Sequence, residues 1–472
     1  MRGSSVSHAT RVRQEIQRFL AIEPVQVAEL ELDDGGALRP GPGSPPVTHG
    51  EVFLLVRRGG RPVATLLGRV PEGADPRAAL TALARRHVAA GPEAVVPTAV
   101  PTAVPTAVPT AVTVPFTSVV IATRERADRL AHALDSMLAQ DHPDFEIVVI
   151  DNAPVTDATR VLVERKYAER VRYVTEPVPG LAVAHNTGLA AARGDVVAFT
   201  DDDVVADPRW LTELTAPFAA DPGLGCATGL ILPARLRTPA QVLLESHGGF
   251  AKGFTPRTYD PAGPPADEPL FPFTAGRFGS GANMAFRTGV LRAVGGFDPA
   301  TGAGTLARGG DDLYGFVRVL AQGHGLHYTP RALVWHHHRE TWQDLETQAY
   351  GYGAGLTAYL TAILVNRPAL LPAFLARLPR GLAHARTLTA VRDSEGAAGA
   401  AGAPGGHDDR GHPWPRRLSR LQRKGMVYGP VGYLRARRAL RAASRQSVMS
   451  GVSGASGASG ASGVSGASGD AR

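Results

Sequence analysis

Three consecutive aspartates, Asp201, Asp202 and Asp203, follow the apolar run VVAFT. Carboxylates this close repel one another, and a bound cation relieves that repulsion. Alternate side chains of an extended segment share one side, so we expect Asp201 and Asp203 to bind one ion while Asp202 faces elsewhere. Oxygen ligands favour Mg²⁺ or Mn²⁺, which keep positions open for substrate phosphates. The alternative is an acidic N-cap for a helix near Pro208.

The elements that must position these carboxylates alternate along the chain from residue 114. Short apolar runs are separated by segments of helical length and spacing, which predicts strands joined by crossover helices in a mostly parallel sheet. Strands this apolar are covered on both faces, so the predicted class is α/β. The runs are TSVVIA, FEIVVID, VRYVT and VVAFTDDD, at residues 117–122, 145–151, 171–175 and 196–203.

Polar residues gather where these runs end. Thr123, Arg124 and Glu125 follow the first run. Asp151 and Asn152 close the second, and the aspartate triplet closes the fourth. Ligands of such sheets bind at the carboxyl ends of the strands. The sequence therefore predicts a ligand site at that edge of the sheet.

Residues 117 to about 345 resemble glycosyltransferase family 2, whose members are inverting enzymes with the Rossmann-like GT-A fold. The matching segments occur in the family's order: VVIATRERADRL, FEIVVIDNA, PGLAVAHNTGLAAARGDVVAFTDDDVVADPRWL, GSGANMAFR, GGFDPATGAGTLARGGDDLYGFVRVLAQGHGLHY and VWHHHR. The resemblance covers about half of the chain. It implies a hexosyltransferase-type enzyme that moves a sugar from a nucleoside-diphosphate sugar to a hydroxyl acceptor.

The resemblance also implies roles for residues on the donor side. Asp201 and Asp203 match the family's DxD motif, which holds Mn²⁺ or Mg²⁺ on the donor diphosphate. The metal stabilises the nucleoside diphosphate as it departs. The residues expected to line the nucleotide pocket or to bind the base and ribose are Thr123, Glu125, Asp151 and Asp202.

A second acidic group lies about a hundred residues further on. Asp311 and Asp312 in GGDDLYG occupy the position of the family's Glu-Asp pair, whose Asp deprotonates the acceptor hydroxyl. We therefore expect Asp312 to be the general base. Inversion by a single displacement needs one base on the acceptor side, opposite a neutralised leaving group. The two acidic clusters supply those two needs.

Histidines supply a further expected metal ligand and one departure from the family. His336, His337 and His338 follow ALVW, where some relatives have a histidine that binds the metal, and we favour His336 over His338. His185 stands where many relatives have Arg, so a charge near the diphosphate is either missing or pH-dependent. Asp311 stands where relatives have Glu, which shortens the first carboxylate of that pair.

Charge is concentrated near the C-terminus. The chain has 472 residues and a formal net charge of +7, but eleven basic residues and no acidic one lie between Arg410 and Arg445, so the remainder is net acidic. That distribution does not indicate nucleic-acid binding. A basic segment beside apolar and aromatic residues suits an anionic membrane surface or an acidic polymer. The alternative is a solvated charged tail.

Composition divides the chain into seven parts. A proline at every fourth position of PTAVPTAVPTAVPTAV prevents a helix or central strand, and the Gly/Ser/Ala repeats lack apolar content. Before the linker, EVFLLVRRGGRPVATLL predicts a hairpin and DPRAALTALARRHVAA a capped helix. The expected parts are an α+β module (1–96), a linker (97–112), the GT-A domain (113–345), an apolar helical extension (346–392), a disordered linker (393–415), the basic segment (416–445) and a disordered tail (446–472).

The sequence also bears on location and partners. There is no secretory leader pattern and no run of about 18 apolar residues, so we expect a cytoplasmic protein that is peripheral on the inner face of the membrane. The expected donor is a UDP-, GDP- or dTDP-sugar, and the expected acceptor is lipid-linked or a polysaccharide of the cell envelope. The single cysteine, Cys226, is expected to be a buried hydrophobe.

Two other classes of function compete with the enzyme. One is a non-catalytic scaffold with a degenerate nucleotide-sugar fold, anchored through its basic tail. The other is a nucleotidyltransferase, which ranks low because no Gly-rich basic loop follows the first strand to hold a triphosphate.

Overall fold

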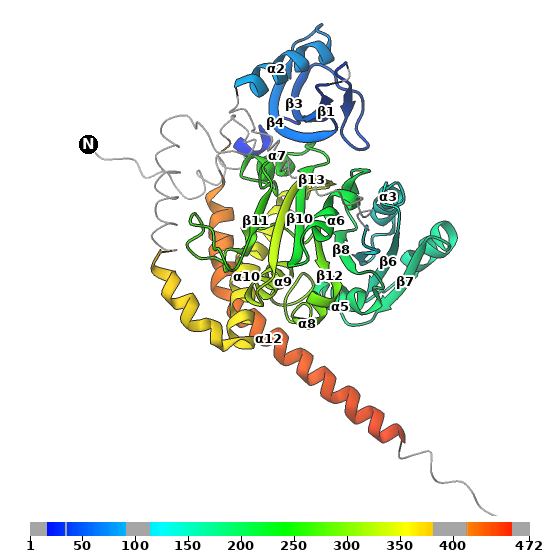
Figure 1. Ribbon diagram of the computed structural model, residues 1–472, viewed down its shortest axis with the longest axis vertical. Helices are drawn as coiled ribbons and strands as arrows, with labels where there is room; N and C mark the ends of the chain where they lie inside the picture. Colours follow the sequence, from blue (N-terminus) through cyan, green and yellow to red (C-terminus); the bar gives the residue numbers. More distant parts are fainter. Residues whose placement is uncertain (1–16, 34, 91–113, 381–411, 413, 456–472) are drawn as a thin grey trace, which may run out of the picture.

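The computed structural model describes residues 17–33, 35–90, 114–380, 412 and 414–455. These residues form a four-stranded sheet near the N-terminus and a nine-stranded sheet in the main body (Figure 1). The predicted α/β class is confirmed. The expected linker at 97–112 and almost all of the one at 393–415 lie outside the described residues.

The N-terminal module is a small α+β unit. The predicted hairpin turns at Gly59 and Gly60, which both have positive φ, and the predicted helix is capped by Asp75, whose Oδ2 accepts from the amide of Ala78 at 3.0 Å. Its sheet has the order β2-β1-β3-β4. The elements are β1 (Gln26–Glu31), β2 (Leu38–Pro40), β3 (Gly50–Arg58), β4 (Arg61–Val70) and α2 (Pro76–Ala90).

The module packs directly on the main body. Val27 and Phe53 share an apolar cluster with Leu232 of the large sheet. The buried Arg57 bonds Asp207 of the main body at 2.6 Å and Glu29 of its own module at 2.9 Å. A buried guanidinium with two carboxylate partners fixes the module in one orientation.

The large sheet is mixed, with a parallel core. Its strand order is β11-β13-β10-β12-β8-β5-β6-β7, and β9 pairs with β13. All four predicted strands are present, but the fourth ends at Asp201, so that Asp202 and Asp203 lie in a turn rather than on an extended segment. The strands are β5 (Thr117–Thr123), β6 (Phe145–Asn152), β7 (Val171–Glu176), β8 (Val196–Asp201), β9 (Val204–Ala206), β10 (Leu224–Pro233), β11 (Arg257–Tyr259), β12 (Asn283–Arg287) and β13 (Gly325–His336).

Strand directions bring the polar strand ends to one edge. Strands β5, β6 and β8 are mutually parallel. Strand β12 is antiparallel to both β8 and β10, so β10 runs in the direction of β8, and β13 is parallel to β10. The carboxyl ends of β5, β6, β8 and β13 therefore meet at the same edge, as expected for a ligand site in an α/β sheet.

Helices cover both faces of the sheet. Helix α3 buries Leu130, Leu134 and Met137, spaced by four and three residues, against one face, where α6 also packs. Helices α5 and α9 contribute to the cluster on the other face. The helices are α3 (Ala127–Leu138), α4 (Ala158–Leu162) continued by the π-helical η1 (Val163–Tyr167), α5 (Leu181–Ala191), α6 (Trp210–Ala220), α7 (Pro239–Ser246), the short η2 (Ala275–Arg277), α8 (Thr288–Ala293) and α9 (Asp311–Ala321).

Two long helices follow the sheet, α10 (Trp342–Asn366) and α12 (Arg416–Ala455), with the short η3 (Pro368–Leu370) after α10. They lie against each other in close contact (Figure 1). Pro430 of α12 lacks an amide hydrogen, and the Met426 carbonyl that it leaves free accepts from Thr357 Oγ1 of α10 at 2.8 Å. Helix α12 continues ten residues past the expected boundary of the basic segment at 445.

Membrane-spanning potential is limited in the described helices. None of them alone has the length and hydropathy to cross a bilayer. The pair Trp342–Asn366 and Pro368–Arg380 passes that test only in combination, and the two are bent by 109° at their junction.

Candidate active site

The aspartate triplet lies at the end of β8, but its members face different partners. Asp202 is buried, and its carboxylate accepts from Thr123 Oγ1 at 2.7 Å and from Arg126 Nη1 at 3.0 Å. Helix α6 begins only at Trp210, and no side chain caps it. The triplet therefore does not act as the N-cap that was the alternative to a metal site.

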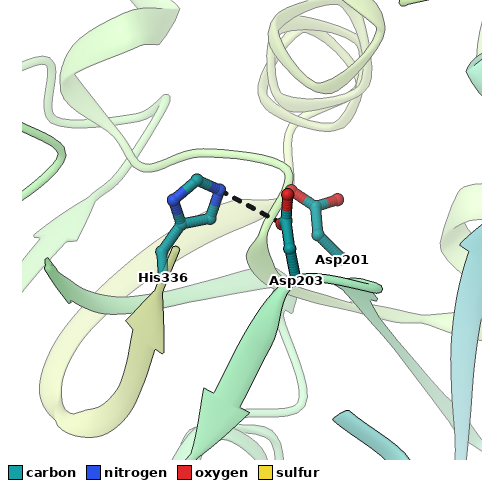
Figure 2. A group of neighbouring side chains, drawn as sticks. All are labelled: Asp201, Asp203 and His336. Carbon is teal, nitrogen blue, oxygen red and sulfur yellow. Dashed lines mark ion pairs between the residues drawn. The ribbon is translucent and has the colours of Figure 1, made fainter. Parts of the chain in front are cut away.

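Asp201, Asp203 and His336 converge as a potential metal-binding group. One ligand atom from each lies within 4.8 Å of the others. Figure 2 shows the His336 ring pointing at the Asp203 carboxylate, with Nε2 3.4 Å from Oδ1, while Asp201 stands beside them. The turn at Asp202 and Asp203, rather than alternation along a strand, brings the two carboxylates together.

A chain of contacts fixes the His336 ring from behind. Its Nδ1 lies 3.2 Å from Nδ1 of His338, and His338 Nε2 lies 3.0 Å from Glu245 Oε2 of α7. His338 is buried, and both rings pack against Phe250. With Glu245 accepting from His338 Nε2–H, the Nδ1 of His338 can only accept. His336 must then donate from Nδ1, which leaves the Nε2 lone pair facing Asp203.

Burial keeps His336 neutral. It lowers the pKa of His336 to about 4, against the opposing effect of Asp203. For Asp203, burial acts to raise the pKa, but His336, Arg339 and Arg126 outweigh it and the pKa is lowered. His336 is neutral near pH 7 and cannot stabilise the Asp203 carboxylate by charge. We therefore attribute the lowered pKa of Asp203 at that pH to the arginines.

Asp201 lies among other carboxylates, which disfavour its ionised form. Burial, followed by the charges of Asp203 and Asp202, raises the pKa of Asp201 well above its usual value. Asp311 and Asp312 contribute to the same rise, so the two acidic clusters lie within electrostatic reach of each other. The neutral nitrogen of His336 faces the Asp203 carboxylate, and the Asp201 carboxylate lies beside them. A divalent cation bound between these three groups would use the nitrogen as a ligand and neutralise the carboxylates.

The second acidic pair occupies the first turn of α9. Gly310 precedes it with φ 87°, and a Cβ there would collide with the Gly355 carbonyl of α10. Asp312 accepts from the amide of Gly281 at 2.9 Å and from that of Leu313 at 2.8 Å. Burial and the neighbouring charge of Asp311 raise the pKa of Asp312 to about 6. A half-buried carboxylate with this pKa is a competent base near neutral pH.

His185 lies beside this pair. It is buried against Phe199 and Phe297, and its Nδ1 is 3.2 Å from Asp311 Oδ2. The alignment is too poor for a hydrogen bond, so within the described part of the chain both atoms are buried without a hydrogen-bond partner. His185 and Asp311, the two residues that differ from the family pattern, are therefore in contact with each other.

The expected nucleotide-binding residues lie at the ends of β5 and β6. Asp151 is buried: Tyr173 donates to its Oδ2 at 2.7 Å, while its Oδ1 has no partner in the described part of the chain. Burial raises the pKa of Asp151. Glu125 is exposed instead, and its carboxylate accepts from both amides of the turn at Val155 and Thr156 and from the Thr156 hydroxyl. Its position is therefore fixed by the loop after β6.

Sequence reasoning missed several side chains of this edge. Arg126, Arg129 and Arg339 surround Asp203 Oδ2 at 3.4, 3.6 and 3.9 Å. The first two stand in RERADR directly after β5, a cluster of charge at a strand end that could have been noticed. Glu245 had no local signal, because it reaches the histidines from a helix about ninety residues earlier in the chain.

The chain is similar in sequence to a known family and to several of its members. Residues 118–294 match the family described as glycosyl transferase family 2. The pre-mycofactocin glycosyltransferase of Mycobacterium tuberculosis is 30% identical over 175 residues, covering 37% of this chain and 33% of that protein. The glucosyl-dolichyl phosphate glucuronosyltransferase of Haloferax volcanii is 26% identical over 192 residues, covering 39% and 56%.

A solved structure gives a weaker likeness. A mannosyltransferase of Pyrobaculum calidifontis in complex with GDP-Man and Mn²⁺ is 20% identical with a TM-score of 0.42, covering 68% of this chain and 88% of that one. At this TM-score the likeness supports no conclusion about this chain. The chain also spans well under two thirds of the length of the two relatives above. The matched segment contains β5 to β8 and the aspartate triplet, so this part of the chain is similar to glycosyltransferase family 2.

Proposed function

We propose that this chain is a metal-dependent, inverting glycosyltransferase that transfers a sugar from a nucleoside-diphosphate sugar to a hydroxyl acceptor. The observation that carries the proposal is the pairing of two acidic groups at one sheet edge. One group, Asp201 and Asp203 with His336, has the donor set for a cation. The other presents Asp312, whose raised pKa suits a base. A scaffold without catalysis requires no such base.

The residues divide the reaction between them. Asp201, Asp203 and His336 would hold Mn²⁺ or Mg²⁺, which when bound stabilises the diphosphate leaving group. The unpartnered Oδ1 of Asp151 is available to accept from the base or ribose, and Thr123 holds Asp202 in place. Asp312 would take the proton from the acceptor hydroxyl as that oxygen attacks the sugar carbon from the side opposite the leaving group.

The natural substrates and place of action form the finer part of the proposal. We propose a UDP-, GDP- or dTDP-sugar as donor, and as acceptor a lipid-linked sugar or polysaccharide of the cell envelope. The protein would then work at the inner face of the membrane as a peripheral protein. The basic residues of α12 support this placement.

A binding experiment tests the core of the proposal. With Mn²⁺ present, the matching nucleoside diphosphate should raise the melting temperature by roughly 5 °C at about a hundred times Kd, and EDTA should remove the shift. The measurement is differential scanning fluorimetry across UDP, GDP and dTDP, followed by metal-dependent hydrolysis of the corresponding sugars. No shift with any of these nucleotides would contradict the proposal and favour the scaffold.

Glu245 offers a test of how the metal ligand is oriented. Glu245→Gln replaces the acceptor for His338 Nε2–H with an amide that can also donate, so the tautomer of His336 is no longer fixed. We expect Mn²⁺ affinity to fall about tenfold to a hundredfold. Isothermal titration with Mn²⁺ and nucleotide measures this, and Glu346→Gln on α10 is the matched control. An unchanged affinity would show that the relay does not orient the ligand.

A further inference from the structure

Helix α12 has two opposite faces, and one of them packs against the rest of the protein. Gly425, Gly429 and Gly432 lie so close to the backbone of neighbouring segments that a Cβ at any of them would collide with the carbonyl oxygens of Tyr350, Ala354 and Leu306 respectively. Tyr433 is fully buried and donates to Asp298 Oδ2 at 2.9 Å. The rotation of the helix about its own axis is therefore set by packing.

The opposite face is apolar at its centre. Val427, Val431 and Leu434 follow one another at spacings of four and three residues, so they share one side of the helix. They are 81%, 46% and 41% exposed. Because packing fixes the rotation of α12, these three neighbouring aliphatic side chains stay exposed as one apolar strip, which the described part of the chain covers only in part.

Basic residues surround this apolar centre. Each of these basic side chains is exposed. Each lies three, four or seven residues from one of the three aliphatic residues or from another basic residue of the group. This spacing places them all on the same side of the helix as the aliphatic residues. Helix α12 contains no Asp or Glu. The basic residues of this face are Arg416, Arg420, Arg423, Lys424, Arg435, Arg438 and Arg441.

We infer that this face of α12 binds an anionic lipid bilayer, with Val427, Val431 and Leu434 among the acyl chains and the basic side chains at the lipid phosphates. An in-plane helix with an apolar strip flanked by Arg and Lys has the chemistry of an interfacial anchor. A hydrated polyanion would match the charges but would leave the three aliphatic side chains in water. Figure 1 shows α12 running along α10 and projecting past the rest of the body.

The inference deepens the proposed function, because a membrane-bound acceptor would be met at this surface. Only the idea that this surface brings the enzyme to a membrane-bound acceptor rests on the proposed function. Binding to vesicles is measured without any sugar, metal or nucleotide. Failure to bind lipid would therefore leave the transferase proposal standing, and failure of transfer would leave the lipid surface standing.

The test is co-sedimentation of the full chain with vesicles of phosphatidylcholine alone or mixed with phosphatidylglycerol, at about 0.1 M salt. We expect binding to the anionic vesicles and little to the neutral ones. Val427→Ser/Val431→Ser/Leu434→Ser should weaken it at least about tenfold. Arg423→Gln/Arg435→Gln/Arg438→Gln should weaken it about a hundredfold, at roughly fivefold for each arginine. All six side chains are exposed, so melting temperatures should not change.

A matched control separates this face from general basicity. Arg61→Gln/Arg85→Gln/Arg86→Gln removes the same charge from exposed positions of the N-terminal module and should change binding less than twofold. Three results would overturn the inference. They are no sedimentation of the unmodified chain with anionic vesicles, an equal loss in the control variant, and unchanged binding in the aliphatic variant, which would identify the face as a polyanion site instead.

Discussion

Asp203→Asn is expected to abolish the Mn²⁺-dependent binding of nucleoside diphosphate and to lower kcat/KM by about a thousandfold. The change removes one of the two carboxylates that face the same point as His336. It also removes the negative charge around which Arg126, Arg129 and Arg339 gather. A metal that stabilises the leaving group contributes several kcal/mol to the transition state, and about 4 kcal/mol corresponds to this factor.

The measurement combines titration of Mn²⁺ in the presence of the nucleotide with steady-state kinetics. Asp128→Asn is the control, because Asp128 is exposed in the first turn of the neighbouring α3 and should keep full affinity. If Asp203→Asn binds Mn²⁺ as tightly as the unmodified chain, the cation is not held where we propose.

Asp312→Asn is expected to lower kcat by about a hundredfold to ten-thousandfold while leaving donor affinity nearly unchanged. The amide can still accept a hydrogen bond from Gly281, but it cannot take a proton from the acceptor. Donor affinity should hold because Asp312 is not in the group that faces the cation. This separation of kcat from binding distinguishes an enzyme from a scaffold.

The pH dependence provides an independent readout of the same residue. The base must be ionised to act, and the pKa of Asp312 is raised to about 6 by burial and by Asp311. Activity should therefore be full above pH 7 and fall tenfold per unit as the pH drops below about 6. A cation bound nearby would move this fall to lower pH. Transfer that survives Asp312→Asn with the same pH profile would remove Asp312 from the mechanism.

The two positions at which the sequence departs from the pattern of glycosyltransferase family 2 lie side by side in the structure. Asp311 is shorter than the usual Glu, but His185 lies 3.2 Å from it where relatives have a longer Arg. The two changes adjoin in space although they are over a hundred residues apart in sequence.

The sequence by itself determined the strands and the edge at which the site lies. Runs such as FEIVVID are apolar throughout, and parallel strands bring their polar ends together whatever the rest of the fold does. The same local logic predicted the hairpin at Gly59 and Gly60 and the helix capped by Asp75. In each case the deciding interactions join residues close in sequence or follow from strand order.

Only the tertiary structure decided how the side chains of the site meet. Asp203 reaches Asp201 through a turn, Glu245 orients His336 through His338, and three arginines converge on one carboxylate. The outward face of α12 likewise depends on glycines that pack against α10. Apart from the pairs Asp201/Asp203 and His336/His338, these contacts join residues more than seventy positions apart in the chain. No local pattern encodes which face of an element turns towards a distant partner.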